Sequence, residues 1–328
     1  MPNVHRLIAA STASVLALAL ASVLWSQAAT ADPVAFIVAI KGRVMVVSGK
    51  GGAGAKAALG RPLERGDKVQ VSPGGSASLF FSDGNVIELG GGGSLTVGGR
   101  LTAADKKRVG PGSEVSAEVF SRVSKFITSE KKQSGLVALA PMRGGAQVSP
   151  LILFPRRSAT LTGAPEFRWR AVAGATRYRV TVTSSEGELW NREPRDTSLA
   201  YPEDARELAP DADYLLEVQA LTETGALRRE ESTFHVMSEG EAAQVRDRLG
   251  SIQQAAGDTS EAAHYLAGSY LVGRGLYADA ARHFEALCRL EPEAAGPHEA
   301  LSSVYRTVGL ADLAQAELER ARVLAAEH

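Results

Sequence analysis

The side chains best suited to catalysis or metal binding are few in this sequence and lie far apart. Cysteine occurs once, as Cys288, and histidine occurs at six positions. The histidines are His5, His235, His264, His283, His298 and His328. No H-E-x-x-H, C-x-x-C or G-x-S-x-G spacing is present, so the usual patterns for a zinc site or a serine nucleophile are missing. The sequence therefore predicts a non-enzymatic protein with no catalytic residue, metal or cofactor.

A glycine-rich stretch, residues 49–60, raises the question of a phosphate-binding loop. It reads GKGGAGAKAALG, and the G-x-x-x-x-G-K-[ST] spacing of such loops is absent. We therefore interpret it as a flexible connection between strands.

Charge is distributed unevenly along the 328 residues. The net charge is +7 for residues 32–144, −3 for 145–236 and −6 for 237–328. A basic front and an acidic back suggest different partners for the two ends, although an ordinary solvated surface would look the same. Few aromatic residues alternate with the basic ones, so nucleic acid is not expected as a partner.

The first 31 residues have the pattern of a secretory signal peptide. His5-Arg6 precedes the apolar run Leu7–Leu24, and Ala29-Thr30-Ala31 supplies small residues before Asp32. Cleavage would make the mature protein periplasmic or secreted. The apolar run is also near the length of a membrane helix, so a retained leader is the alternative and the only expected membrane contact.

Residues 35–97 alternate short apolar runs with tight turns, which is typical of a β domain. The runs have strand length and cannot form a core singly. They are Phe36–Ile40, Val44–Val47, Val69–Val71, Ala77–Phe81, Val86–Leu89 and Leu95–Val97. Gly66-Asp67, Asp83-Gly84 and Gly90–Gly93 separate several of them.

This stretch resembles the FecR-like domain, the envelope-side module of sigma-regulator proteins. The resemblance rests on short motifs in a fixed order and covers about a fifth of the chain. The motifs are Gly42-x-Val44-x-Val46, Leu63-x-x-Gly66-Asp67-x-Val69, Ala77-x-Leu79 and Asp83-Gly84-x-x-x-x-Leu89. It implies a non-catalytic sensing or binding domain outside the cytoplasm. Only about six residues precede the apolar leader, so we expect no counterpart of the cytoplasmic anti-sigma segment of that family.

An amphipathic helix is predicted across Ser113–Lys132, inside a β-rich domain that we expect to span residues 32–144. Its apolar residues fall at helical spacing. They are Val115, Val119, Val123, Phe126 and Ile127. We expect this stripe to pack on the β domain; a helix lying on a membrane surface is the alternative.

Residues 148–236 predict a β-sandwich. Phe167, Trp169 and Ala171 alternate with Arg168 and Arg170, which places the two sets on opposite faces of a strand. An early core tryptophan, and Tyr214 four residues after Pro210, resemble the immunoglobulin or fibronectin type III fold. The resemblance implies a tyrosine corner, with the Tyr214 hydroxyl bonded to backbone near Leu208.

Three arginines on the predicted outer face of this sandwich could bind an anionic cell-wall or surface polymer. They are Arg168, Arg170 and Arg179. The alternative is a solvated face on which they pair with nearby glutamates.

Residues 239–328 contain a repeat of 34 residues after a first helix, Gly240–Gln254. Gly275, Ala280, Phe284 and Leu290 recur as Gly309, Ala314, Leu318 and Leu324. The period and the small residues resemble the tetratricopeptide repeat. The family's tryptophan position holds His264 and His298 instead. Because two copies are few for such an array, the last helix, Leu313–Leu324, is expected to stay partly apolar.

The resemblance implies a groove along the first helix of each copy in which a peptide from an envelope protein would bind. Its lining would be available to solvent without holding the core. The residues predicted to line it are Tyr265, Ser269, Val272, Glu299, Ser303 and Arg306. An empty, solvated groove is the alternative. For Cys288, a buried apolar role and an intermolecular disulfide both stay open.

Together these observations predict a multidomain envelope protein that acts as a binding or scaffold module. The FecR-like domain would face an envelope ligand, and the tetratricopeptide tail a protein. One alternative is a FecR-type signalling or receptor subunit retained by its leader. The other is an unrecognised envelope hydrolase.

The leader yields the first testable prediction. Signal peptidase needs small residues before its cut, so the mature chain should begin at Asp32. Mass analysis of the N-terminus of exported protein checks this. Recovery of most of the protein with Leu7–Leu24 intact would contradict it and favour the anchored receptor.

Overall fold

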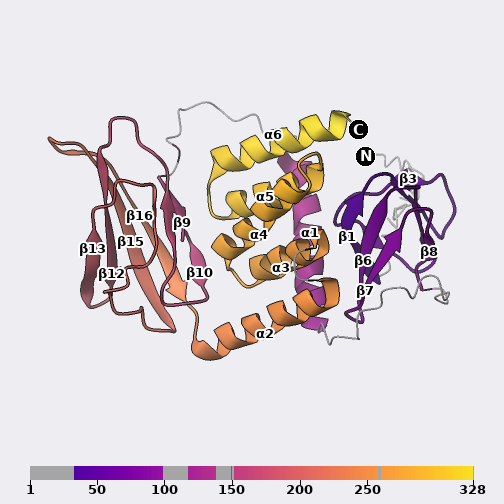
Figure 1. Cartoon of the computed structure of the whole chain (residues 1–328), viewed down its shortest axis with the longest axis horizontal. Helices are drawn as coiled ribbons and strands as arrows, with labels where there is room; N and C mark the ends of the chain where they lie inside the picture. The colour runs from indigo at the N-terminus through magenta and orange to yellow at the C-terminus, as the bar shows by residue number, and fades with distance from the viewer. Residues whose placement is uncertain (1–32, 99–116, 138–148, 150, 258–259, 328) are drawn as a thin grey trace, which may run out of the picture. The chain divides into compact units, whose positions relative to one another are not determined.

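The structure of the chain is a computed structural model that describes residues 33–98, 117–137, 149, 151–257 and 260–327. The predicted leader lies outside these ranges, as do the expected domain boundaries near residues 144 and 148. Across the ranges that are described, no helix combines the length and the apolar character needed to cross a bilayer. The chain has a β-rich N-terminal part, a second β part and a helical C-terminal region (Figure 1).

The N-terminal β part is built from two four-stranded sheets with the orders β4-β1-β6-β7 and β3-β2-β5-β8. Its strands are β1 (Ala35–Lys41), β2 (Val44–Val47), β3 (Ala55–Lys56), β4 (Pro62–Leu63), β5 (Lys68–Val71), β6 (Ser76–Phe81), β7 (Val86–Gly90) and β8 (Ser94–Thr96). Aliphatic side chains from both sheets share one buried cluster, which includes Ile37, Val69 and Leu79. The predicted apolar runs thus form a closed β core.

Strand β1 is buried on both faces, which explains its unbroken run of apolar residues. Successive side chains point to opposite faces of a strand. Ala35 and Ile37 belong to the core between the two sheets. Phe36 and Val38 belong to a second cluster that includes the helices. A strand that packs on both sides needs a continuous apolar sequence rather than alternation.

The Gly66-Asp67 turn shows what the residues of the FecR-like motif do. Gly66 has a φ of +94°, in the region that favours glycine. The buried Asp67 carboxylate accepts the backbone N–H groups of Gly49 and Glu64, both at 3.0 Å. These bonds fix the glycine-rich loop to the start of β5. In this structure the motif residues therefore serve the scaffold.

Helix α1 (Ala117–Val137) carries the predicted apolar stripe from Val119 onward, and Val119, Val123, Phe126 and Ile127 are all buried, whereas Val115 lies outside the described residues. The helix packs on the β domain, as expected, and it also packs on the C-terminal helices, which the sequence did not predict. Phe120 contacts Phe36 and Phe80, with ring centroids 5.1 and 5.6 Å apart. The buried stripe belongs to the cluster of the C-terminal helices. Because the stripe is buried within the protein, it is not offered to a membrane surface.

The second β part is a sandwich of a five-stranded sheet, β10-β16-β15-β12-β13, and a three-stranded sheet, β14-β11-β9. Its strands are β9 (Ile152–Phe154), β10 (Ser158–Thr160), β11 (Phe167–Trp169), β12 (Arg177–Ser184), β13 (Gly187–Arg192), β14 (Ser198–Leu199), β15 (Ala212–Leu221) and β16 (Ala226–Val236). Phe167 and Trp169 lie in its core, as predicted. The Tyr214 hydroxyl donates to the Ala209 carbonyl at 3.1 Å, one residue from the position expected for a tyrosine corner.

The C-terminal region consists of α2 (Glu239–Ala256), α3 (Glu261–Gly273), α4 (Tyr277–Leu290), α5 (Ala295–Thr307) and α6 (Ala311–Glu327). Ser238 and Ser260 cap α2 and α3 with side-chain bonds to backbone N–H groups. Two hairpins, α3–α4 and α5–α6, repeat the 34-residue period. Gly275 and Gly309 stand at the two turns with φ of +75° and +81°.

Most repeat positions have the burial that the period predicts. Ala280 and Phe284 are fully buried, and Ala314 is buried in the second hairpin. Phe284 lies so near Gly268 of α3 that a Cβ there would sit 2.7 Å from its ring. Leu290 departs from the pattern, because it stands at the end of α4 and is 46% exposed.

A buried arginine joins the sandwich to the second hairpin. Arg156 is only 8% exposed. Its Nε donates to the Val308 carbonyl at 2.9 Å, and its Nη1 lies 2.6 Å from Glu230 Oε1. The other Glu230 oxygen accepts the backbone N–H groups of Leu151 and Ile152. One network thus fixes the start of β9, strand β16 and the end of α5.

This network yields the second prediction. Arg156→Gln should lower the free energy of unfolding by about 2–4 kcal/mol, because it removes the nearer cation of Glu230, leaving only Arg228 at 4.0 Å, and it removes the donor to the Val308 carbonyl. Urea denaturation of the full chain measures the change. Arg322→Gln, which removes an exposed pair with Glu319, should change stability by less than about 1 kcal/mol. Equal midpoints for the two variants would contradict the role given to Arg156.

Candidate protein-binding groove

The first helices of the two hairpins, α3 and α5, are the expected walls of the groove, and α1 lies against them (Figure 1). Helices α1 and α3 approach closely at Gly273, where a Cβ would lie 3.0 Å from the Cβ of Arg122. The Arg122 guanidinium donates to the Gly273 carbonyl. Phe126 stacks on Phe284 of α4, with ring centroids 5.5 Å apart. A helix of the same chain therefore occupies the position expected for the groove.

Three of the six predicted groove residues are not available to solvent, so their assignment as an exposed lining is wrong. Tyr265 is 2% exposed, and its hydroxyl oxygen lies 2.5 Å from the position a Cβ would take on Gly60. Ser269 is fully buried, and its hydroxyl donates to the Tyr265 carbonyl at 2.7 Å. Ser303 is also buried. For Tyr265 the physical reason is that the loop at Gly60, which Ile127 of α1 also borders, lies over its hydroxyl.

The other three predicted residues keep some access to solvent. Val272 and Arg306 are half-buried, and Glu299 is exposed. Val272 packs against the helical cluster that α1 completes. Their role in binding a partner stays a prediction.

Charged side chains hold the N-terminal end of α1. Arg122 Nε donates to Glu118 Oε1 at 3.0 Å. Guanidinium nitrogens of Arg248 on α2 and Arg274 after α3 lie 3.9 Å from the same carboxylate. Arg274 lies equally far from Glu241. These loose, partly exposed pairs favour one orientation of α1 in the groove more than they add stability.

The loop before β4 reaches the same helices. A Cβ on Gly296, at the start of α5, would lie 2.7 Å from the Leu59 Cβ. Ile127 of α1 also borders Gly60. The β part, α1 and the hairpins therefore meet around the residues once expected to line an open groove.

The three arginines expected to form one anionic-ligand face do not lie together, so this assignment is wrong. Arg168 lies on β11 in the three-stranded sheet and Arg170 directly follows this strand, whereas Arg179 lies on β12 in the five-stranded sheet. Arg170 pairs with Asp312 of α6 at 2.8 Å, and Arg168 approaches Glu285 of α4 at 3.5 Å. Arg179 pairs with Glu193 at 2.7 Å. Each arginine therefore has a carboxylate partner, but only Arg179 pairs with a nearby glutamate as the alternative interpretation expected.

At equivalent positions, each hairpin has a pair of polar side chains that includes a histidine, and we call each pair a couple. His264 Nδ1 lies 3.1 Å from His283 Nδ1, between α3 and α4. Thirty-four residues later, His298 Nδ1 lies 2.6 Å from Glu317 Oε2, between α5 and α6. Burial, with help from His264 and Arg282, lowers the pKa of His283 to about 4. Burial also lowers the pKa of His264, which lies near Arg289. The first couple is therefore neutral at pH 7.

Cys288 lies beside the second couple, with Sγ 3.7 Å from His298 Nδ1. It is half-buried, and burial together with Glu317 and Glu285 raises the pKa of its thiol to about 12. A protonated thiol is a poor nucleophile and a poor metal ligand. This environment favours the buried apolar role over an intermolecular disulfide. In the described ranges, no three or more His, Cys, Asp or Glu side chains are grouped to hold a metal.

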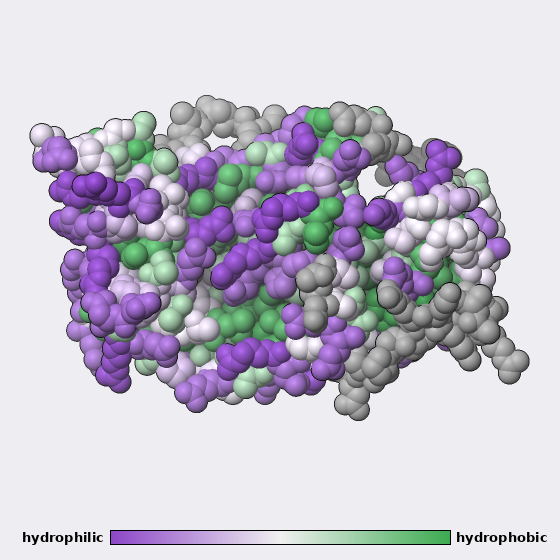
Figure 2. Space-filling view, in the orientation of Figure 1, coloured by the Kyte–Doolittle hydropathy of each residue, from purple (hydrophilic) through white to green (hydrophobic). Residues whose placement is uncertain are grey.

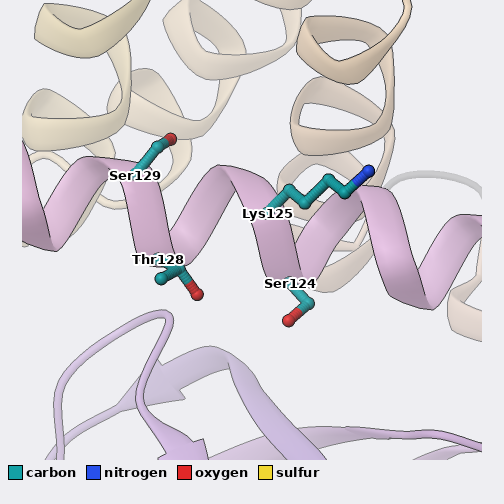
Figure 3. A pocket seen from close by; sticks show the side chains of 4 residues that line it. All are labelled: Ser124, Lys125, Thr128 and Ser129. Atoms are coloured by element: carbon teal, nitrogen blue, oxygen red, sulfur yellow. The ribbon is translucent and has the colours of Figure 1, made fainter.

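A cavity of about 410 Å³ runs along α1 and is lined by four of its residues (Figure 3). They are Ser124, Lys125, Thr128 and Ser129. Ser124 and Thr128 point to one side of the helix, and Lys125 and Ser129 to the other. The Ser129 hydroxyl already donates to the Phe126 carbonyl. We assign no ligand to this cavity.

Few large hydrophobic side chains are exposed among the described residues. On the side shown in Figure 2, hydrophilic residues predominate and hydrophobic ones form small separate areas. The exposed large hydrophobic residues among those described lie on four different elements. They are Leu189, Leu227, Leu290 and Val323. Helix α6 buries Ala314, Ala321 and Leu324, so it is less apolar outside than the sequence suggested.

Comparison with known proteins gives no family. No family model matches the sequence, and no curated protein matches it. Parts of the chain are similar to solved structures. A cell surface anchoring domain is 29% identical over 20% of this chain and 86% of its own, with a TM-score of 0.19.

Fibronectin type III domains are also among these structures. The domain from human collagen alpha-1(XX) chain is 18% identical over 30% of this chain and 94% of its own, with a TM-score of 0.23. A two-domain segment of chicken tenascin is 12% identical over 62% and 93%, with a TM-score of 0.19. All three TM-scores are below 0.5, so we base no functional inference on these likenesses.

The first histidine couple yields the third prediction. The ordinary histidine pKa of 6.5 applies to the unfolded chain, so between pH 6.5 and about 4 the unfolded chain binds a proton at His283 that the folded chain does not. The contribution of His283 to the free energy of unfolding is therefore fully present above pH 6.5. It should fall by about 3 kcal/mol as the pH is lowered toward 4. Urea melts from pH 7.5 to 4.5 measure the slope.

The variant His283→Gln should flatten that slope, whereas the surface variant Arg322→Gln should keep it. A slope that is the same in wild type and His283→Gln would show that the buried couple does not titrate as inferred.

Proposed function

We propose that this protein is a non-enzymatic scaffold of the cell envelope, periplasmic or secreted, whose helical tail binds an amphipathic helix. The observation that carries the proposal is α1, which lies with its apolar stripe in the groove of the hairpins. A groove that buries valine, phenylalanine and isoleucine at helical spacing has the chemistry of known helix-in-groove recognition. The partner class is therefore a protein that presents such a helix.

The buried stripe indicates how strongly such a helix could bind. Fully burying a valine, isoleucine or phenylalanine side chain is worth about 1.5–3 kcal/mol each. Val119, Val123, Phe126 and Ile127 are each no more than 3% exposed. The summed free energy of burying these side chains must exceed the conformational entropy that the helix loses when it becomes ordered. The surplus contributes to specific binding. Because α1 is tethered to the groove, a helix from another protein must compete with it at a high effective concentration.

The finer assignments belong to the same proposal. We assign residues 1–31 to a cleaved signal peptide, 32–144 to a FecR-like domain, 148–236 to a fibronectin type III-like sandwich and 239–328 to tetratricopeptide-like hairpins. The motif order in the first domain, the two-sheet core with Tyr214 in the second and the 34-residue period in the third support these assignments. Sensing and binding, rather than turnover, are the activities that such modules share.

A labelled peptide of residues 117–137 tests the proposal on the full chain. Phe126→Ala should weaken the packing of α1 against the hairpins by about 3–5 kcal/mol, because it removes the ring that stacks on Phe284. The freed groove should then bind the peptide at least about tenfold more tightly than the wild-type chain does. Fluorescence anisotropy measures both affinities.

A peptide carrying Val123→Asp and Phe126→Asp is the control and should not bind either chain. Circular dichroism must first show that the helices of the variant chain are intact. If that chain then fails to bind the native peptide, the hairpins do not form a helix-binding groove and the proposal is wrong.

A further inference from the structure

The outer face of the β3-β2-β5-β8 sheet gathers exposed polar and cationic side chains. Cross-strand partners lie side by side on one face of a sheet. Lys68 stands opposite Thr96, and Gln70 opposite Ser94. All four are exposed, while the alternate residues of β5 and β8 are buried in the core. Lys56 extends the face on the far side of β2, where it stands opposite Met45.

Cations on this face have no carboxylate partner among the described residues, which distinguishes them from the arginines of the sandwich. Lys56, Arg65 and Lys68 are exposed and take part in none of the ion pairs found there. Arg65 lies along Gly98, two residues after Thr96, which places it near Lys68 at the end of the face.

The carboxylates of this β part are placed elsewhere. Asp67 is buried and accepts two backbone N–H groups. Glu64 is held by Lys50. Asp83 and Glu88 belong to the turn before β7 and to β7 itself, in the other sheet. The outer face of the β3-β2-β5-β8 sheet therefore carries cations with no facing carboxylate among the described residues of this β part.

We propose that this face binds an acidic polysaccharide through Lys56, Arg65, Lys68, Gln70, Ser94 and Thr96. The proposal rests on the proposed envelope function and names a ligand for its β-rich domain. Ammonium and guanidinium groups suit the carboxylates of uronic acid units. The amide and hydroxyl side chains between them donate and accept, as sugar hydroxyls require. Strands about 4.8 Å apart present these groups in parallel rows, which fits an extended polymer better than a compact anion.

The chemistry of the face argues against two other anionic partners. Single-stranded nucleic acid needs aromatic side chains on which bases stack, and the described residues of this face include none. A membrane surface would need projecting apolar groups beside the cations. Met45 and Val47 are half-buried, and Gly54 lies against both side chains.

Polygalacturonate oligomers are the probe, with the full chain at low salt. We expect binding that weakens as salt is raised, since the contacts are exposed charges. Lys56→Gln together with Lys68→Gln should lower the affinity about tenfold or more. The matched control, Arg320→Gln with Arg322→Gln on α6, removes the same charge elsewhere and should leave the affinity unchanged.

Three outcomes would overturn the proposal: no binding by the wild-type chain, equal loss in both double variants, or equal binding of anionic vesicles or single-stranded DNA at the same face. The α1 peptide assay on Phe126→Ala is run in parallel. Its success beside a failed polysaccharide assay would reject this ligand and leave the helix-binding function standing. The opposite result would reject the groove alone.

Discussion

The structure depends on one interaction, the burial of the apolar stripe of α1 between the N-terminal sheet and the C-terminal hairpins. Phe120 contacts Phe36 and Phe80 on one side, while Phe126 stacks on Phe284 on the other. The helix thus joins segments that are far apart in sequence into a single apolar cluster. Loss of this contact would expose apolar residues of β1, α1 and α3 together, so the free energies of these elements are coupled.

This coupling accounts for local features that have no explanation within one domain. Strand β1 has no polar face because Phe36 and Val38 pack toward α1. Gly273 sits where α1 and α3 approach closely, and Gly60 where Tyr265 reaches the β part. Arg156 strengthens the same assembly from the other side, by joining the sandwich to the end of α5. Two hairpins are fewer than a stable repeat array normally needs. The contacts with α1 and the sandwich give them additional packing partners.

Local patterns predicted the elements well, but not which surfaces meet. The stripe from Val119 to Ile127, the alternation around Trp169 and the 34-residue period each follow from spacing within a short segment. The burial of Tyr265 depends on the loop at Gly60 and on the adjoining α1, which lie more than 120 residues earlier and which no local pattern specifies. The continuous apolar run of β1 was the available signal that the β part has a second buried face. The prediction of an arginine-lined binding face was wrong for a similar reason. Arg170 and Arg168 pair with Asp312 and Glu285, which are distant from them in sequence.

Native-state hydrogen exchange of the full chain tests most directly whether α1 is part of the core. If the stripe is buried as described, backbone amides at residues 123–127 should be as strongly protected as those at residues 266–271 of α3, and both should open in the same unfolding event. Rapid exchange of the α1 amides while α3 stays protected would contradict the account. It would show that α1 leaves the groove freely and that the hairpins are stable without it.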